Sequence, residues 1–298
     1  MYFYWLDMLD NHQTIKAKTI LSRLKEDKYF GLSYNMNLYK GCQHQCIYCD
    51  SRSTCYQIED FSKIMVKDNA LSLLNKELSS KRYRGTIGFG SMNDPYMPVE
   101  KTINLTGKAL KIVAYHRFPV HIITKSNLVL KDLEVLKDIS KVYAAVSFTI
   151  TSADDEMAGI LEPHAPPPSR RFEAIKKLSE ENIYTGITMM PVLPFINDTA
   201  DNVRGMVKKA EAAGAKYIIP FFGTTLREGS RDYLYKELDK SFPGLRSRYE
   251  ETYGNSYSCQ SPKAEYLSNL FYSLCKDAGI DTRMKFYEPD QGEQLKLF

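Results

Sequence analysis

The stretch GCQHQCIYCD, residues 41–50, contains three of the six cysteines of the chain. Cys42, Cys46 and Cys49 are spaced C-x3-C-x2-C, and thiols so close together in one short loop indicate ligands of a single metal centre. A zinc ion would need a fourth ligand, for which His44 and Cys55 are the nearby candidates. An iron–sulfur cluster held by only three cysteines would instead keep one iron open to a substrate or cofactor.

Outward from this loop, apolar strands alternate with amphipathic helices. Alternation of this kind predicts parallel strands with helices outside them, so the fold class is α/β. Six such units suit a partial (β/α)6 barrel of the TIM type, although periodicity alone does not separate it from a doubly wound sheet. The strands are predicted at 34–38, 86–89, 120–124, 142–150, 183–190 and 217–222, and the helices at 67–78, 105–115, 130–139, 169–182 and 199–213.

The remainder of the chain divides around this core. Residues 1–30 form an N-terminal lead-in, in which 15–24 are a short helix or an extended segment. Residues 31–225 form the (β/α)6 core. Residues 226–298 form a C-terminal extension of helical and mixed structure that packs on the barrel. Helices are expected there at 231–240 and 263–278, with a late strand at 281–286.

Composition bounds the class of protein. The 298 residues are 43% hydrophobic and 26% charged, as in ordinary globular chains. A net charge of +4 is only mildly basic and does not by itself indicate nucleic-acid binding. There is no apolar run of membrane-spanning length and no signal-peptide pattern, so we expect a cytoplasmic protein without a membrane partner. Thiols stay reduced in that compartment, which favours metal binding over disulfides.

The cysteine spacing, with Tyr48 directly before Cys49, resembles the signature of the radical S-adenosylmethionine (SAM) superfamily. The resemblance implies a [4Fe–4S] cluster on Cys42, Cys46 and Cys49, with SAM on the fourth iron. It also implies the partial (β/α)6 barrel. Reduction of the cluster, by a one-electron partner of the flavodoxin or ferredoxin type, would cleave SAM to methionine and a 5′-deoxyadenosyl radical.

Five stretches between about residues 34 and 200 also resemble the spore photoproduct lyase-like (SplB-like) branch of that superfamily. They are NLYKGCQHQCIYCD, NDPYMPVE, ITKSNLVLKDLEVL, LEPHAPPPSRRFEAIKKLSE and PVLPFIND, in this order. This resemblance implies SAM contacts near Tyr48, Lys125 and Ser147. It also implies a structural acid–base pair beside the site, formed by Glu162 with Arg170 or Arg171.

Polar residues at the predicted strand ends agree with such a site, because the chemistry of a parallel barrel collects at the carboxyl ends of its strands. Lys125 directly follows an apolar strand and would pair with the SAM carboxylate. Asn93 and Ser147 would hydrogen-bond to ribose and methionine groups. Gly90 would let the backbone approach a ligand closely, although a simple turn is an equal explanation for this glycine.

One departure concerns the hydrogen-atom donor. Spore photoproduct lyase uses a cysteine at the end of the second strand, where this chain has Ser91 and Met92. An O–H bond is too strong to replace S–H readily in hydrogen-atom transfer. Repair of spore photoproduct by the thiol route is therefore not expected. Cys259 and Tyr96 are the alternative candidates for a catalytic donor.

The sequence thus predicts a radical SAM enzyme, lyase-like, whose substrate is unidentified. The chain lacks the cysteine-rich C-terminal extension that holds auxiliary clusters in many peptide-modifying relatives, which favours a nucleic-acid lesion or modification. Two alternatives stay open: a radical SAM enzyme that acts on a peptide, and a non-catalytic nucleic-acid-binding module stapled by a metal, either a cluster or a zinc ion bound through Cys55.

Overall fold

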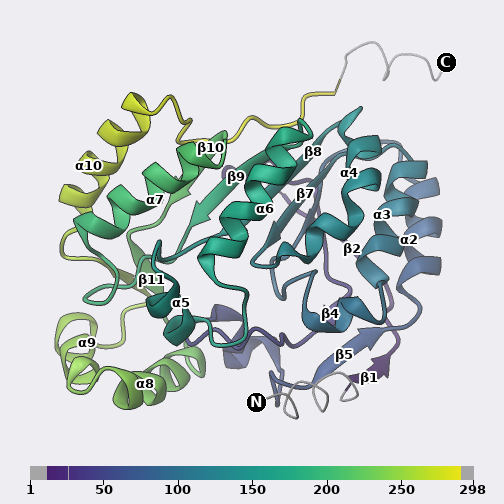
Figure 1. The fold of residues 1–298 in the computed structure, drawn as a ribbon. Helices are drawn as coiled ribbons and strands as arrows, with labels where there is room; N and C mark the ends of the chain where they lie inside the picture. Colours follow the sequence, from purple (N-terminus) through teal and green to yellow (C-terminus); the bar gives the residue numbers. More distant parts are fainter. Residues whose placement is uncertain (1–11, 26, 290–298) are drawn as a thin grey trace.

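A curved sheet of seven strands forms the centre of the computed structural model, which describes residues 12–25 and 27–289 (Figure 1). Its strand order is β10-β9-β8-β7-β6-β3-β2, in which β3 to β10 are parallel and β2 is an antiparallel edge strand. The strands are β2 (Leu21–Arg23), β3 (Tyr34–Met36), β6 (Ile87–Phe89), β7 (Val120–Thr124), β8 (Ala144–Thr149), β9 (Tyr184–Met189) and β10 (Tyr217–Pro220). All six predicted parallel strands are present.

Five helices cover the outer face of this sheet (Figure 1). They are α2 (Ala70–Ser79), α3 (Leu105–Tyr115), α4 (Leu133–Ser140), α6 (Pro168–Glu180) and α7 (Ala200–Ala212). Each buries an apolar stripe of helical period; in α7 it is Val203, Met206, Val207 and Ala210. All six residues of β8 are buried, because the strand lies between the helices and the barrel interior, and four of the six are apolar. The predicted partial (β/α)6 barrel is confirmed.

The described part of the lead-in, residues 12–25 and 27–30, is extended rather than helical. It contributes β2 to the main sheet and β1 (His12–Ile15) to a separate three-stranded sheet of order β1-β5-β4. The other two members are β4 (Tyr39–Lys40) and β5 (Ile64–Lys67), which lie on either side of the cysteine loop. This small sheet therefore fixes where the loop leaves the barrel and where it returns.

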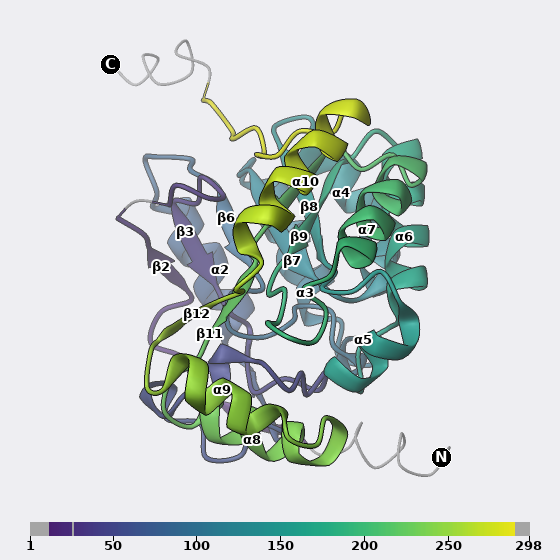
Figure 2. The ribbon, with the colours of Figure 1, turned by 90° about the vertical axis from the view of Figure 1, so that its left-hand side faces the viewer.

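After β10 the chain forms a two-stranded antiparallel sheet of β11 (Gly223–Thr225) and β12 (Ser258–Gln260). Between these strands lie α8 (Ser230–Ser241) and α9 (Leu245–Tyr253), next to the segment that follows the cysteine loop. The last helix, α10 (Ala264–Asp277), packs on α7 (Figure 2). The helices expected at 231–240 and 263–278 are thus present, whereas α9, β11 and β12 carry no periodic signal.

The strand expected at 281–286 is wrong, because Asp281 forms only an isolated bridge with Tyr217. The segment instead crosses the amino ends of the strands: the Lys285 amide donates to the Tyr184 hydroxyl (2.9 Å) and the Tyr143 hydroxyl donates to the Lys285 carbonyl (2.7 Å). Within the described part of the chain, no helix combines the length and the apolar character needed to cross a bilayer.

Candidate active site

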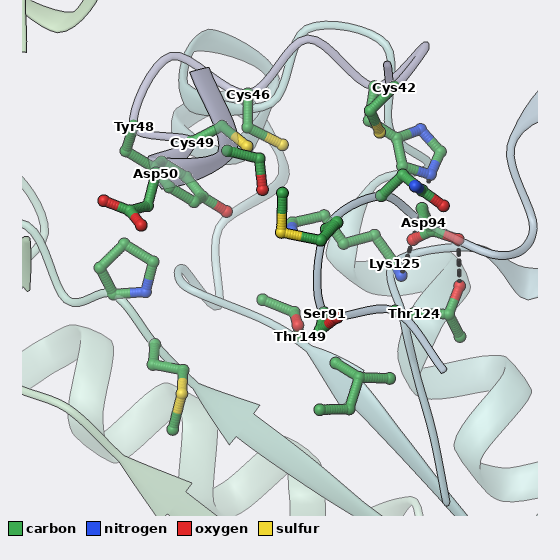
Figure 3. Close-up of a pocket in the computed structure, with 18 of the residues that line it drawn as sticks. Cys42, Cys46, Tyr48, Cys49, Asp50, Ser91, Asp94, Thr124, Lys125 and Thr149 are labelled. Atoms are coloured by element: carbon green, nitrogen blue, oxygen red, sulfur yellow. Dashed lines mark hydrogen bonds and ion pairs between the residues drawn. The ribbon is translucent and has the colours of Figure 1, made fainter. Parts of the chain in front are cut away.

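A cavity of about 380 Å³ opens at the carboxyl ends of the parallel strands (Figure 3). The loops that follow β3, β6, β7, β9 and β10, together with the last residue of β8, all contribute to its wall. This is the end of a parallel barrel at which binding and catalytic groups converge. The residues that line the cavity include Cys42, His44, Cys46, Tyr48, Cys49, Gly90, Ser91, Asn93, Asp94, Thr124, Lys125 and Thr149.

The three cysteines of the signature all line this cavity, whereas Cys55 does not. Cys55 is exposed, and its sulfur lies 3.7 Å from the Arg227 guanidinium. Figure 3 shows the thiols of Cys46 and Cys49 close together, with the thiol of Cys42 apart from them. Among the described residues, no three His, Cys, Asp or Glu side chains are arranged to hold a single metal ion. Separated thiols suit a cluster, in which each thiolate binds its own iron, better than one tetrahedral zinc.

Burial dominates the chemistry of these thiols. It raises the pKa of Cys42 to about 12, with a further contribution from the nearby Asp94 carboxylate, and it also raises the pKa of Cys46. The thiols of Cys42 and Cys46 are therefore protonated in the metal-free chain, and they must release protons when they bind a metal. Three thiols that line one cavity are the donor set that an iron–sulfur cluster with one open iron requires.

Asp94 joins the loop after β6 to the end of β7 and to the cysteine loop. Its Oδ1 accepts from the Thr124 hydroxyl (2.7 Å), and its Oδ2 accepts from the Lys125 amide (2.6 Å). The His44 Nε2 lies 3.3 Å from the same Oδ2. Burial alone would raise the pKa of this carboxyl, but His44 and the hydrogen bonds lower it to about 2. His44 is thus already engaged by a carboxylate and is a poor fourth metal ligand.

Lys125 supplies a half-buried cation to the cavity. In Figure 3 its side chain extends across the cavity, and its Nζ lies 5.7 Å from the centroid of the Tyr48 ring. Burial lowers the pKa of this lysine, but the nearby Cys46 side chain and the Glu162 carboxylate outweigh burial and raise the pKa overall. The side chain therefore carries its positive charge at neutral pH and favours an anionic ligand in the cavity.

The predicted acid–base pair forms between Glu162 and Arg171, not Arg170. Both partners are fully buried, and Glu162 also accepts a hydrogen bond from the Tyr48 hydroxyl. Arg170 instead lies at the surface, where its Nη1 is 3.1 Å from Glu173. The Tyr48 hydroxyl is therefore already engaged by a buried carboxylate, although Tyr48 also lines the cavity.

Gly90 and Asn93 both line the cavity, as expected for residues after β6. Gly90 has φ +94°, and a Cβ at this position would lie 2.0 Å from the Ile123 carbonyl oxygen. The Asn93 Nδ2 donates to the Tyr39 carbonyl (2.7 Å), which orients the loop. Glycine is thus required at position 90 both by the positive φ of the turn and by close packing on β7.

We expect Gly90→Ala to destabilise the fold by at least about 1–3 kcal/mol, from backbone strain alone, with the contact to Ile123 adding to this cost. Gly159→Ala is the matched control. Gly159 lies inside α5 (Asp155–Leu161) with nothing within 4 Å of the added Cβ, so alanine there should stabilise by about 0.5–1 kcal/mol. Urea unfolding of the two variants measures both effects, and equal midpoints would contradict the expectation.

Three predicted site residues lie outside the cavity wall. Ser147 lies one layer deeper in the barrel than Thr149, where its hydroxyl bonds to His121 Nε2 (2.7 Å) and to the Tyr217 hydroxyl (2.6 Å). Tyr96 is buried with its hydroxyl donating to Asp132 (3.0 Å). Cys259 is buried in β12, opposite Thr224. The hydroxyl at the place of the lyase thiol, that of Ser91, does line the cavity and donates to Asn35 Oδ1 (2.9 Å).

The His121 ring beneath the cavity gives the fold a predictable response to acid. Burial lowers its pKa from an ordinary value near 6.5 to about 3. The unfolded chain therefore binds this proton more readily, and stability is lost as pH falls from about 6.5 towards 3, by about 1.4 kcal/mol per pH unit. His121→Gln should flatten the pH dependence of the urea midpoint by that amount. The half-buried His116, whose ring bonds to Asn75, provides the control variant His116→Gln, and equal slopes for the two variants would contradict this expectation.

Sequence comparison decides the family. The profile of the Radical SAM superfamily matches residues 36–224, which span the barrel and the cysteine loop. The chain belongs to the radical SAM superfamily. The predicted membership is confirmed, and it indicates an enzyme whose cofactors are a [4Fe–4S] cluster and SAM and which needs an electron donor.

Three similar proteins illustrate the relationship. An uncharacterized protein of Methanocaldococcus jannaschii is 33% identical, over 76% of this chain and 84% of its own. The radical SAM Nα-GlyT isomerase of Pseudomonas phage M6 is 24% identical, over 61% of this chain and 37% of its own. A spore photoproduct lyase variant with bound AdoMet and dinucleoside spore photoproduct superposes with a TM-score of 0.69 over 93% of this radical SAM chain and 83% of the lyase, at 13% identity. At that identity the likeness shows the fold.

Sequence reasoning did not single out Asp94, Thr124 or Thr149 as parts of the site. Asp94 belongs to the quoted stretch NDPYMPVE, in which an acidic residue after a glycine-flanked strand is a usable signal. Thr149 follows Ser147 by two residues and so lies on the same face of β8. Ser147 and Thr149 differ only in their depth in the barrel, and that depth depends on strand register.

Proposed function

We propose that Cys42, Cys46 and Cys49 bind the [4Fe–4S] cluster and that Lys125 pairs with the carboxylate of SAM in the same cavity. The single observation that supports this proposal most is that these three thiols and the Lys125 cation line one cavity at the carboxyl ends of the strands. The cluster, once reduced, supplies the electron that cleaves SAM to methionine and a 5′-deoxyadenosyl radical. The protein groups hold the ligands and exclude water around them.

The rest of the cavity wall bears on the substrate. It combines apolar side chains with hydroxyls, amides and the carboxylates of Asp50 and Asp94, and Lys125 is the one cation lining the cavity among the described residues. The apolar members are Phe61, Met92, Ile123, Met190 and Phe221. Such a surface suits a planar, uncharged group with hydrogen-bonding edges, such as a nucleobase, better than a phosphate or a carboxylate. We infer that the substrate is a modified or damaged nucleic-acid component.

Neither residue predicted as the hydrogen-atom donor lines the cavity. Tyr96 and Cys259 were proposed for this role from the sequence, but each is buried away from the cavity and already hydrogen-bonded, Cys259 to the Ser256 carbonyl at 3.6 Å. A part for either residue would require the cavity wall to rearrange. By the sequence resemblance, Ser91 stands where spore photoproduct lyase has its thiol, which argues against spore photoproduct as the substrate by the thiol route.

Anaerobic reconstitution with iron and sulfide tests the proposal. The protein should turn brown and bind about four irons and four sulfides per chain, and dithionite with SAM should then yield 5′-deoxyadenosine and methionine. A loaded cluster that forms neither product would contradict the proposal. Adding lesion-bearing oligonucleotides or, separately, peptides should raise 5′-deoxyadenosine formation only with the true substrate class; stimulation by peptides alone would overturn the nucleic-acid assignment.

A further inference from the structure

Arg171 is the largest fully buried side chain of the described residues, and it lies beside the proposed cluster loop. Its guanidinium pairs with Glu162, and it also donates from Nη1 to the Thr149 carbonyl (2.8 Å) and from Nε to the Pro166 carbonyl (2.8 Å). Thr149 is the last residue of β8 and lines the cavity. One buried cation thus links the end of a core strand to a buried carboxylate.

Glu162 continues this link to the cysteine loop. One of its carboxylate oxygens faces Arg171, and the other accepts from the Tyr48 hydroxyl. Tyr48 lies directly before Cys49 and only two residues after Cys46. Polar contacts therefore run without a break from the end of β8 to the cysteine loop. The Thr149 carbonyl contacts Arg171, Arg171 contacts Glu162, and Glu162 contacts the Tyr48 hydroxyl.

The backbone around Glu162 supports the same loop at two further points. The Ile47 amide donates to the Leu161 carbonyl (2.9 Å), and the His164 amide donates to the His44 carbonyl (3.3 Å). Residues 161–164 therefore contact the loop at His44, Ile47 and Tyr48. The Cys42 end of the loop has anchors of its own, since the Cys42 amide donates to the Phe61 carbonyl (3.0 Å) and the Gln43 Oε1 accepts from the Val99 amide (2.8 Å). The contacts with residues 161–164 also hold the part of the loop that carries Cys46 and Cys49.

We propose that Glu162 and Arg171 are positioning residues, which fix the metal-binding loop against the end of β8 through the Tyr48 hydroxyl and so hold Cys46 and Cys49 in place. The inference rests on the proposed metal-binding role of this loop. It assigns the hydroxyl of Tyr48 to the protein scaffold, whereas the sequence had placed Tyr48 among the SAM contacts.

The physical reason is the cost of leaving any member of the chain unpaired. A buried carboxylate that loses a hydrogen bond, or a buried guanidinium that loses its partner, is strongly destabilising. The loop is therefore held in the one position that satisfies all three side chains. Residues that orient metal ligands from outside the ligand set typically change metal affinity or activity by about 10- to 100-fold when they are replaced.

Tyr48→Phe is the decisive variant, because it removes only the hydroxyl and leaves the Glu162–Arg171 pair intact. After reconstitution we expect a full cluster that is lost to an iron chelator about 10-fold faster than in the wild type. We also expect a broadened electron paramagnetic resonance spectrum of the reduced cluster. Tyr249→Phe is the matched control: it removes a buried hydroxyl bonded to the Pro194 carbonyl (2.9 Å), and it should change neither readout.

A double-mutant cycle shows whether Tyr48 acts through Glu162. Glu162→Gln alone should accelerate cluster loss, and adding Tyr48→Phe should increase the rate by much less than 10-fold, because the link is already cut. If Glu162→Gln does not fold, the rate of cluster loss and the resonance spectrum of Tyr48→Phe still test the positioning role. A wild-type protein without a cluster would defeat the proposed function itself. A loaded wild type that Tyr48→Phe matches in both readouts would leave the proposed function standing and overturn this inference.

Discussion

Replacing Cys42, Cys46 or Cys49 by alanine is expected to abolish cluster binding and the formation of 5′-deoxyadenosine. Each of these thiols lines the cavity, and a cluster reduced to two protein ligands is not retained. Iron should fall from about four atoms per chain to near zero after reconstitution and desalting. Iron and sulfide analysis with the visible absorbance of the cluster measures the loss, and product analysis after dithionite and SAM measures the activity.

Cys55→Ala is the matched control for these variants. Cys55 lies six residues after Cys49 but is exposed and outside the cavity, so iron content and product formation should equal those of the wild type. Loss of metal from Cys55→Ala, or a reconstituted protein that holds zinc in place of iron, would favour the alternative of a zinc-stapled binding module. Retention of a full cluster by any of the three cavity variants would show that another residue binds iron.

Replacing Lys125 by methionine is expected to weaken SAM binding by roughly 10- to 100-fold. Methionine keeps the length of the side chain and removes the charge, and a hydrogen bond to a charged group contributes about 1.5–3 kcal/mol. The dissociation constant of SAM for the reconstituted protein, measured by titration, should rise while iron content stays unchanged. Lys63→Met is the control, since Lys63 is exposed, lies outside the cavity wall and has its Nζ 3.7 Å from the Asp60 carboxylate.

An unchanged SAM affinity in Lys125→Met would show that this lysine balances the charge of the loop rather than holding the cofactor. Its pKa is raised by the Cys46 thiolate and by Glu162, so a charge-balancing role would instead appear as lower iron content. The two measurements therefore separate the two roles of one side chain.

The order of strands and helices was predictable because each element of the barrel buries a face of fixed period. The six strands and five covering helices were all found within a few residues of their limits, and the cysteine spacing identified the loop. Short elements had no such signal. β4 has only two residues and pairs with β5 across the cysteine loop, so nothing local distinguishes it from coil.

The side-chain pairing at the site depended on angles that the sequence leaves open. Arg170 and Arg171 are neighbours on α6, about 100° apart around its axis, and only the orientation of the helix on the sheet decides which one is buried. Ser147 and Thr149 share a face of β8, and the register that pairs Ser147 with Ile123 and Gly186 sets Ser147 below the cavity. A local sequence pattern therefore predicts which face of a strand or helix a residue occupies, but not how deep in the barrel its side chain lies.

The segment that begins α8 lies against the residues that follow the cysteine loop. The Thr54 amide donates to the Glu228 carbonyl (3.1 Å), and the Arg52 guanidinium lies over the Tyr233 ring, 3.7 Å from its centroid. A fragment cut after the last barrel strand would therefore lose an anchor of its own metal loop, however well the barrel itself folded. Minimal versions of this protein, and chimaeras with relatives, should carry α8 together with the barrel if they are to keep their iron.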